Sequence, residues 1–285
     1  MGAALREAVD RGFELHGSLG KGVVLVHGLT GAPGEMKYLA RQLHRRGFSV
    51  RAPQLAGHCA DTRALLRTTW RDWLESVHGA FEALRGEVDE VYAAGICVGG
   101  ALGIALAAER PELAGVAVYS MTFRYDGWNM RHWYSAAVPW LEPFANLPGV
   151  RRVSFREPYP FGLKDEKLRE AVARSPNGVI DGALDRLPLG SMYQMHRLSL
   201  HVERVGSRVA QPVLILHARE DDMSDPRNAL RLRAALAGPV ELRLVEDSYH
   251  MLHVDKQRDA VANATALFFG ASETGALRRR ARPPA

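Results

Sequence analysis

The sequence predicts an α/β protein in which a mostly parallel central sheet is flanked by helices. Short apolar runs rich in β-branched residues alternate with segments of helical periodicity, and these runs are apolar throughout, as in a sheet covered on both faces. The alternation stops between Ser120 and Gln211, a stretch of about ninety residues that exceeds any ordinary connection. We therefore expect an inserted, mostly helical lid between two parts of the sheet.

The first part of the sheet is expected before residue 121. The segment after the first apolar run has apolar residues at helical spacing, beginning with Met36 and Leu39. The expected strands are residues 23–28, 48–53, 91–96 and 115–120, and the expected helices are 32–46, 68–86 and 98–109. The last helix is rich in glycine and alanine, so it can lie close against the sheet.

The second part of the sheet is expected after the break. The runs PVLILHAR (212–219) and VELRLVE (240–246) predict strands, and helical patterns follow them at 226–237 and 255–269. Within the break, residues 165–174 have a clear helical pattern. We therefore divide the chain into a core of residues 1–120 and 206–270 and a lid of residues 121–205.

Residues 271–285 are expected to be a disordered basic tail. Four arginines and one glutamate give this stretch a charge of +3, which leaves +2 of the formal +5 for the rest of the chain. Low apolar content and two prolines near the end are typical of disorder. The basic charge thus belongs to a tail, and we expect no nucleic-acid partner.

The composition is that of an ordinary globular protein, with 47% hydrophobic and 24% charged residues. No apolar stretch reaches the roughly 18 residues that span a bilayer, so we expect a cytoplasmic protein without an integral membrane segment. Two cysteines, Cys59 and Cys97, are too few for a disulfide framework or a metal cluster. We therefore expect thiol chemistry, with no metal and no cofactor. The sequence does not indicate an oligomeric state.

The segment from Gly95 to Gly99, with Cys97 between them, lies where an expected buried strand becomes a helix. It has the spacing of a nucleophile elbow, G-x-nucleophile-x-G, with cysteine as the nucleophile. Side chains at the two glycines would collide across the strained turn, and the helix N-terminus favours both a thiolate and an oxyanion. Cys97 is therefore the candidate nucleophile. The alternative interpretation is a buried structural cysteine in a glycine-rich turn.

Candidate partners for Cys97 follow the next two expected strands. The first of these loops carries the carboxylates Glu220, Asp221, Asp222 and Asp225, of which the three aspartates are the candidates. His250 follows the last strand, and His253 is a weaker candidate that we expect to pack beside the loop. The order nucleophile, acid, histidine predicts that His250 accepts the thiol proton while one carboxylate fixes its tautomer.

A turn after the first strand predicts an oxyanion hole. In His27-Gly28-Leu29-Thr30-Gly31 the glycines allow the backbone N–H of Leu29 to point toward the nucleophile, beside the N–H of Val98. We expect His27 to hold the turn rather than to react.

These motifs resemble the bacterial carboxylesterase and monoacylglycerol lipase branch of the α/β-hydrolases. The matching segments are HGLTGAPGEM, the loop 53–58, TTWRDW, AGICVGG, HAREDDMSDP and SYHMLHVD, and they cover about residues 20–120 and 200–270. The resemblance implies an α/β-hydrolase fold with nucleophile Cys97, base His250 and oxyanion donors Leu29 and Val98. It also implies Asp221 as the acid, which spacing alone does not select.

The sequence departs from that branch at the nucleophile, where the esterases have serine. A cysteine elbow is similar to those of polyhydroxyalkanoate synthases and dienelactone hydrolases. A thiol is the stronger nucleophile at neutral pH, and it forms a thioester that can be passed to acceptors other than water. Acyl transfer is therefore a serious alternative to hydrolysis.

We accordingly predict a cysteine-dependent hydrolase that cleaves a carboxylic ester or thioester with an apolar acyl group. Its substrate would be a small acyl compound, either free or carried as a thioester on coenzyme A or a carrier protein. One alternative is an acyltransferase or condensing enzyme that passes the acyl group from Cys97 to an alcohol or amine. Another is a noncatalytic binding protein of the same fold, which would normally have lost part of the constellation.

The lid is expected to supply the apolar part of the substrate site, because it is rich in aromatic residues. The candidate substrate-binding residues are Trp128, Trp133, Tyr134 and Trp140. The candidates for contacting a polar end of the substrate are Arg124, Arg131, His132 and Lys164.

Overall fold

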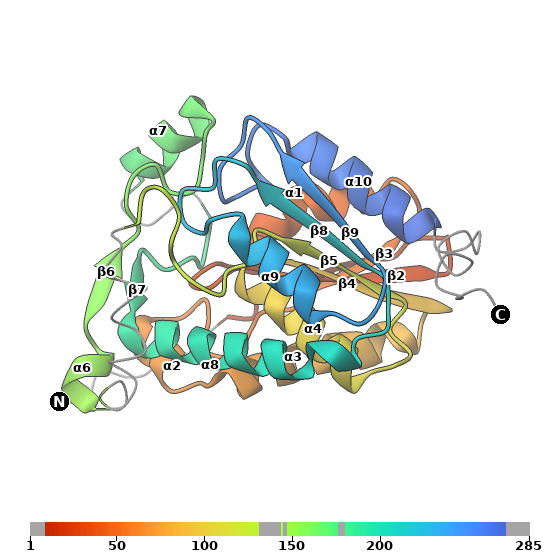
Figure 1. The fold of residues 1–285 in the computed structure, drawn as a ribbon, viewed down its shortest axis with the longest axis horizontal. Helices are drawn as coiled ribbons and strands as arrows, with labels where there is room; N and C mark the ends of the chain where they lie inside the picture. Colours follow the sequence, from red (N-terminus) through yellow and green to blue (C-terminus); the bar gives the residue numbers. More distant parts are fainter. Residues whose placement is uncertain (1–8, 131–143, 145–146, 176–179, 272–285) are drawn as a thin grey trace.

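A computed structural model describes residues 9–130, 144, 147–175 and 180–271 of the chain. The predicted α/β architecture is confirmed: a seven-stranded sheet has the order β1-β3-β2-β4-β5-β8-β9 (Figure 1). All neighbouring strands are parallel except β1, which is antiparallel to β3. The strands are β1 (Phe13–Leu15), β2 (Lys21–Val26), β3 (Ser49–Ala52), β4 (Glu90–Ile96), β5 (Gly115–Tyr119), β8 (Val213–Ala218) and β9 (Val240–Val245).

Helices cover both faces of the sheet, which explains why its central strands are mostly apolar and almost entirely buried. On one face lie α1 (Lys37–His44) and α10 (Arg258–Ala271), and on the other lie α3 (Trp70–Arg85), α4 (Val98–Glu109) and α8 (Leu189–Val205) (Figure 1). Two further helices are α2 (Thr62–Leu66) and α9 (Arg227–Ala235), and α9 packs against β8 and β9. Because α4 is apolar on every side, it can occupy the middle of this layer.

The insert between β5 and β8 contains strands as well as helices. Its described elements are α6 (Pro148–Arg151), β6 (Ser154–Arg156), α7 (Glu166–Arg174), β7 (Arg186–Pro188) and α8. Strands β6 and β7 form an antiparallel pair, which the expectation of a mostly helical lid did not include. Each of these strands is only three residues long, too short to give an alternating pattern.

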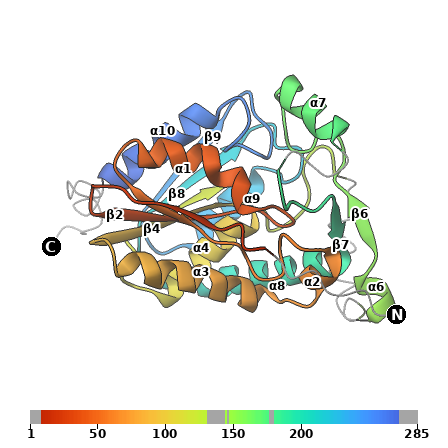
Figure 2. The same ribbon diagram turned by 180° about the vertical axis from the view of Figure 1, so that it is seen from behind.

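The position of α8 differs from that of the other elements of the insert. Its buried residues Met192, Met195, Leu198 and Val202 recur at helical spacing, and the helix packs against α3 and α4. By contrast, α7, β6 and β7 gather at one end of the molecule (Figure 2). Residues of α7 line the same cavity as Gly28 and Cys97, so this group lies over the carboxyl ends of β2 and β4.

Two expected helices have different limits in the structure. Residues 32–46 form a short 3-10 helix, Pro33–Met36, followed by α1, because Pro33 begins a tighter turn. The last helix begins at Arg258 rather than residue 255 and ends at Ala271. Residues 272–285, nearly all of the expected tail, lie outside the described residues.

Candidate active site

The turn between β4 and α4 has the geometry expected from its two glycines. Cys97 adopts a left-handed conformation, with φ 53° and ψ −113°. A Cβ atom at Gly99 would lie 2.2 Å from the carbonyl oxygen of Val26, and one at Gly95 would lie 2.5 Å from the carbonyl carbon of Gly99. The turn therefore excludes side chains at both glycines, and it holds the Cys97 thiol at the N-terminus of α4.

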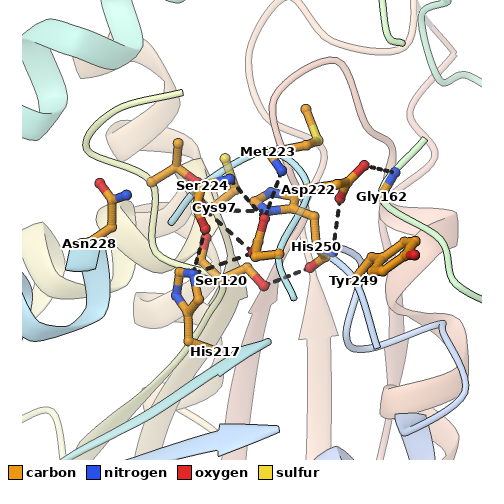
Figure 3. A network of polar contacts seen from close by, with 12 residues as sticks. Cys97, Ser120, Gly162, His217, Asp222, Met223, Ser224, Asn228, Tyr249 and His250 are labelled. Atoms are coloured by element: carbon orange, nitrogen blue, oxygen red, sulfur yellow. Dashed lines mark hydrogen bonds and ion pairs between the residues drawn. The ribbon is translucent and has the colours of Figure 1, made fainter. Parts of the chain in front are cut away.

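The His250 ring contacts one of the three candidate carboxylates. Nδ1 of His250 lies 3.0 Å from both Oδ1 and Oδ2 of Asp221. Asp221 is itself fixed, because its Oδ1 accepts hydrogen bonds from the backbone N–H groups of Met223 and Ser224 at 2.9 and 2.8 Å. Cys97, Ser224 and His250 thus come together from three different segments of the chain (Figure 3).

The other two carboxylates have structural partners. Asp222 accepts hydrogen bonds from the backbone N–H groups of Gly162, at 3.1 Å, and His250, at 3.3 Å. Asp225 accepts from the backbone and side chain of Arg227 at the start of α9. Asp222 therefore shapes the histidine loop, and Asp225 stabilises a helix end. The His250 ring is left to Asp221.

The charges of this pair reinforce each other. Burial opposes a charged imidazole, but the Asp221 carboxylate and a hydrogen bond with Cys97 raise the pKa of His250 well above its ordinary value. Burial also opposes a charged carboxylate, yet His250 and then His217 lower the pKa of Asp221. The site thus stabilises an imidazolium beside a carboxylate.

Two further side chains, those of Met195 and Tyr125, lie at Cys97, and the sequence analysis identified neither as a site residue. Met195, on α8, places its Sδ atom 3.9 Å from Sγ of Cys97. The hydroxyl of Tyr125 donates a hydrogen bond to the same Sδ atom at 3.1 Å. The helical spacing of α8 could have placed Met195 on a buried face, but no motif connects it with Cys97.

The Gly28–Gly31 turn, for which an oxyanion hole was predicted, lines the same cavity as Cys97. Leu29 lines the same cavity as Cys97, and Val98 is the first residue of α4. His27 holds the turn from behind: its Nε2 accepts a hydrogen bond from the N–H of Leu55 at 3.3 Å. Burial, followed by the nearby His58, lowers the pKa of His27 to about 3, so this ring stays neutral.

A buried carboxylate supports the same turn. Oε1 of Glu35 accepts a hydrogen bond from the N–H of Gly28 at 2.6 Å, and Glu35 is only 4% exposed. Burial raises the pKa of Glu35 to about 7, although the Gly28 hydrogen bond opposes this. On the other side, Nε2 of His253 lies 4.0 Å from Oε1 of Glu35. Glu35 thus lies between the turn and the histidine loop. A single glutamate in a helix gives no sequence signal for such a role.

Cys97 opens into a cavity of about 660 Å³. Much of its wall is apolar and comes from the insert, namely Phe161, Leu163, Leu168, Val172, Ile180, Leu184 and Leu187. Glu35, Tyr125 and Glu157 add polar groups to the wall. Burial raises the pKa of Glu157, while His250 lowers it. The cavity therefore offers a long apolar region and a few polar groups near the thiol.

Of the predicted lid aromatics, Trp128 belongs to the described part of the chain, and it does not line this cavity. Trp128 is 57% exposed, and its Nε1 donates a hydrogen bond to the carbonyl of Glu220 at 2.9 Å. Its ring packs edge-to-face on Tyr249, outside the cavity wall, because the chain here folds over the acid loop. The candidates Trp133, Tyr134 and Trp140 lie outside the described residues.

The polar lid candidates that belong to the described residues, Lys164 and Arg124, do not line this cavity either. Lys164 is half-buried and forms ion pairs with Glu220 and Asp247. The backbone N–H of Arg124 donates to Asn228, and its side chain is exposed. Arg131 and His132 lie outside the described residues. None of these placements puts a cation beside Cys97.

The second cysteine has a different environment. Cys59 is buried, and burial raises the pKa of its thiol to about 11. It is therefore protonated at neutral pH. Among the described residues, no cluster of His, Cys, Asp and Glu could hold a metal ion, and no helix is long and apolar enough to cross a membrane.

Comparisons with known proteins agree with this architecture. A family model described as serine aminopeptidase, S33, matches residues 18–257. The thermostable monoacylglycerol lipase of Bacillus sp. (strain H-257) is 26% identical over 250 residues, which cover 87% of this chain and 90% of that protein. The carboxylesterase of Bacillus subtilis (strain 168) is 23% identical over 243 residues, which cover 85% and 89%. A structure from the metagenome-derived lipolytic enzymes LipS and LipT has a TM-score of 0.76 at 25% identity, covering 94% of this chain and 100% of that chain.

Proposed function

Because the chain belongs to the serine aminopeptidase S33 family of α/β-hydrolases, we propose that it is an ester hydrolase whose nucleophile is the thiol of Cys97. The observation that supports this most strongly is the position of His250, which interacts with both the Cys97 side chain and the Asp221 carboxylate. A structural cysteine would need neither a histidine nor a buried carboxylate behind it. Relatives named as a monoacylglycerol lipase and a carboxylesterase support an ester as the substrate.

In the proposed reaction, His250 accepts the proton of Cys97 and the thiolate attacks the ester carbonyl carbon. The carbonyl oxygen becomes an oxyanion, which accepts hydrogen bonds from the backbone N–H groups of Leu29 and Val98. When the C–O bond of the ester breaks, His250 returns the proton to the leaving alkoxide. The acyl group remains on Cys97 as a thioester. His250 then activates a water molecule, which releases the acid and restores the thiol.

The cavity supports a substrate with an apolar acyl group. Its volume of about 660 Å³ lies within the range of small-molecule sites, and the insert supplies a largely apolar wall. Glu157 interacts electrostatically with His250, so it lies near the reacting residues. Its polar side chain suits the alcohol part of an ester better than a hydrocarbon tail. A medium or long acyl ester of a small alcohol therefore fits the site best.

The thiol itself favours one second candidate, acyl transfer. A thioester intermediate is more reactive toward amines, alcohols and thiols than an ester intermediate, so Cys97 could pass its acyl group to a bound acceptor. Acyl donors carried on coenzyme A or on a carrier protein belong to this alternative. A noncatalytic binding role is the least supported, because His250 interacts with both Cys97 and Asp221, as a catalytic triad requires.

Intact-protein mass spectrometry after mixing with esters and thioesters of different acyl length tests the proposal. We expect a transient mass increase equal to one acyl group, located on the peptide that contains Cys97, followed by its loss in water. The Cys97→Ala variant should show no such adduct. An adduct that persists until an alcohol or amine is added would favour acyl transfer. Turnover without any adduct on Cys97 would refute the cysteine mechanism.

A further inference from the structure

The Cys97 sulfur has a second polar neighbour besides His250. The Tyr125 hydroxyl lies 3.1 Å from Sδ of Met195, and that sulfur lies 3.9 Å from Sγ of Cys97. The phenol also interacts directly with the Cys97 side chain. Tyr125 and Cys97 both line the cavity, whereas Met195 is buried on α8 and contacts both of them. The three side chains therefore form a compact group at the point where a substrate carbonyl would meet the thiol.

The acceptors offered to the Tyr125 hydroxyl are weak in the resting protein. Within the described part of the chain they are sulfur atoms, those of Met195 and Cys97. A thioether or a neutral thiol accepts hydrogen bonds poorly, so burying a hydroxyl against them gains little. A thiolate is a much stronger acceptor, because a hydrogen bond to a charged group is about twice as strong as a neutral one. The contact is therefore favourable chiefly when Cys97 is ionised.

The phenol is suited to act as a donor only. Burial, and then the nearby Cys97 and Glu157, raise the pKa of Tyr125 well above its ordinary value, so the hydroxyl keeps its proton across the working range of pH. The titratable groups that face this pair are His250, from the loop after β9, and Glu157, from the segment after β6. His250 in its charged form stabilises a thiolate, whereas Glu157 in its charged form opposes one.

We propose that Tyr125 is a catalytic residue whose hydroxyl donates a hydrogen bond to the Cys97 thiolate. The inference rests on the proposed role of Cys97 as nucleophile. The proton of Cys97 passes to His250, and the negative charge left on sulfur is then stabilised by the imidazolium and by the hydrogen bond from the phenol. When the sulfur becomes part of a thioester it loses its charge, and the hydroxyl returns to Sδ of Met195. Met195 thus keeps the phenol in place during the part of the cycle in which the thiolate is absent.

The test measures the thiolate without any substrate. Iodoacetamide alkylation of the Cys97 peptide is followed by mass spectrometry between pH 5 and pH 9, with thiolate absorbance near 240 nm as a second readout. In Tyr125→Phe we expect the midpoint of the alkylation profile to move to higher pH and the rate at pH 7 to fall about tenfold, the size expected for one hydrogen bond to a charged group. Tyr193→Phe is the matched control, because Tyr193 is also buried but its hydroxyl accepts from Arg197 on the same helix.

A second variant covers a failure of Tyr125→Phe to fold. Site-specific incorporation of 3-fluorotyrosine at Tyr125 keeps the shape but makes the phenol a stronger donor, so the midpoint should move to lower pH. An unchanged profile in both variants would overturn the inference, as would an equal shift in Tyr193→Phe. These outcomes are separate from the proposed ester hydrolysis. If Cys97 is acylated by esters but its alkylation profile is the same in the Tyr125 variants, only the proposed role of Tyr125 fails. If esters do not react, the alkylation profile still tests whether Tyr125 stabilises the Cys97 thiolate.

Discussion

Nδ1 of His250 lies at the same distance, 3.0 Å, from both carboxylate oxygens of Asp221. Since His250 transfers the proton while Asp221 orients and stabilises the ring, loss of the two should have unequal effects. We expect His250→Ala to lower kcat/KM by at least about 10³-fold, and Asp221→Asn by about 10²-fold, because a thiol depends less on that support than a hydroxyl. Steady-state hydrolysis of a p-nitrophenyl ester measures both.

Asp225→Asn is the matched control for Asp221→Asn, because Asp225 contacts Arg227 rather than the histidine. It should leave kcat/KM within about twofold of the unaltered protein. A harmless Asp221→Asn beside a damaging Asp222→Asn or Asp225→Asn would mean that the acid has been assigned to the wrong residue.

Replacement of the two cysteines should separate reactivity from packing. Cys97→Ala should abolish hydrolysis and leave the melting temperature nearly unchanged, because the substitution removes one atom at a site open to the cavity. Cys59→Ala should remain active, since the Cys59 thiol is protonated at neutral pH. Activity assays and thermal unfolding of both variants provide the check. Hydrolysis by Cys97→Ala, or its loss in Cys59→Ala alone, would contradict the assignment.

The apolar wall of the cavity predicts a preference for longer acyl groups. An octanoyl ester should give a higher kcat/KM than an acetyl ester, because burial of the chain positions the carbonyl against the thiol. Val172→Trp, which fills part of the cavity from α7, should reduce the octanoyl rate at least about tenfold and spare the acetyl rate. Ala171→Trp is the control, because Ala171 is exposed and its side chain does not reach the cavity wall. Equal rates for all chain lengths would show that the wall does not bind the acyl group.

The buried Glu35 should make stability depend on pH. Burial raises its pKa from 4.5 to about 7 in the folded protein, so its stabilising contribution is complete below pH 4.5. It is lost as the pH rises toward 7, because the folded state must then ionise a buried carboxyl that the unfolded state ionises in water. The loss should be about 3 kcal/mol in the free energy of unfolding, spread over pH 4.5 to 7. Urea unfolding at several pH values measures it.

Glu35→Gln should remove this pH dependence while keeping an oxygen to accept the N–H of Gly28. Glu166→Gln is the control, because Glu166 is largely exposed on α7 and should not change the profile. If Glu35→Gln and the unaltered protein lose stability in parallel between pH 5 and pH 7, another group causes the loss.

The parts of the fold that were predicted correctly are those in which local pattern and tertiary environment agree. Strands β2, β4, β5 and β8 are mostly apolar because helices cover both of their faces. An apolar run in the sequence therefore predicts a buried parallel strand. The elbow could be predicted for a similar reason, since glycines at two fixed positions are required by a single tight turn. Strands β6 and β7 are three residues long each and are too short to show such a pattern.

The parts of the site that were missed depend on contacts between distant segments. Tyr125 and Met195 are separated by 70 positions, and neither belongs to a motif. Glu35 and His253 meet across the sheet edge only after the whole domain has folded. The predicted role of Trp128 followed from the aromatic content of the insert, but content does not show which face of a segment lines a cavity. Such residues can be found only from coordinates.

The antiparallel pairing of β6 with β7 ties together the two ends of residues 157–185, the stretch that contains α7. The pairing fixes where the chain leaves and returns, so a change of length inside this stretch need not move the strands of the seven-stranded sheet (Figure 2). Much of the apolar wall thus belongs to one continuous stretch, whereas Cys97, Asp221 and His250 lie in other segments of the chain. A lineage can acquire a new substrate by changing the wall residues of this one stretch, provided that Gly162 keeps its hydrogen bonds to the acid and histidine loops.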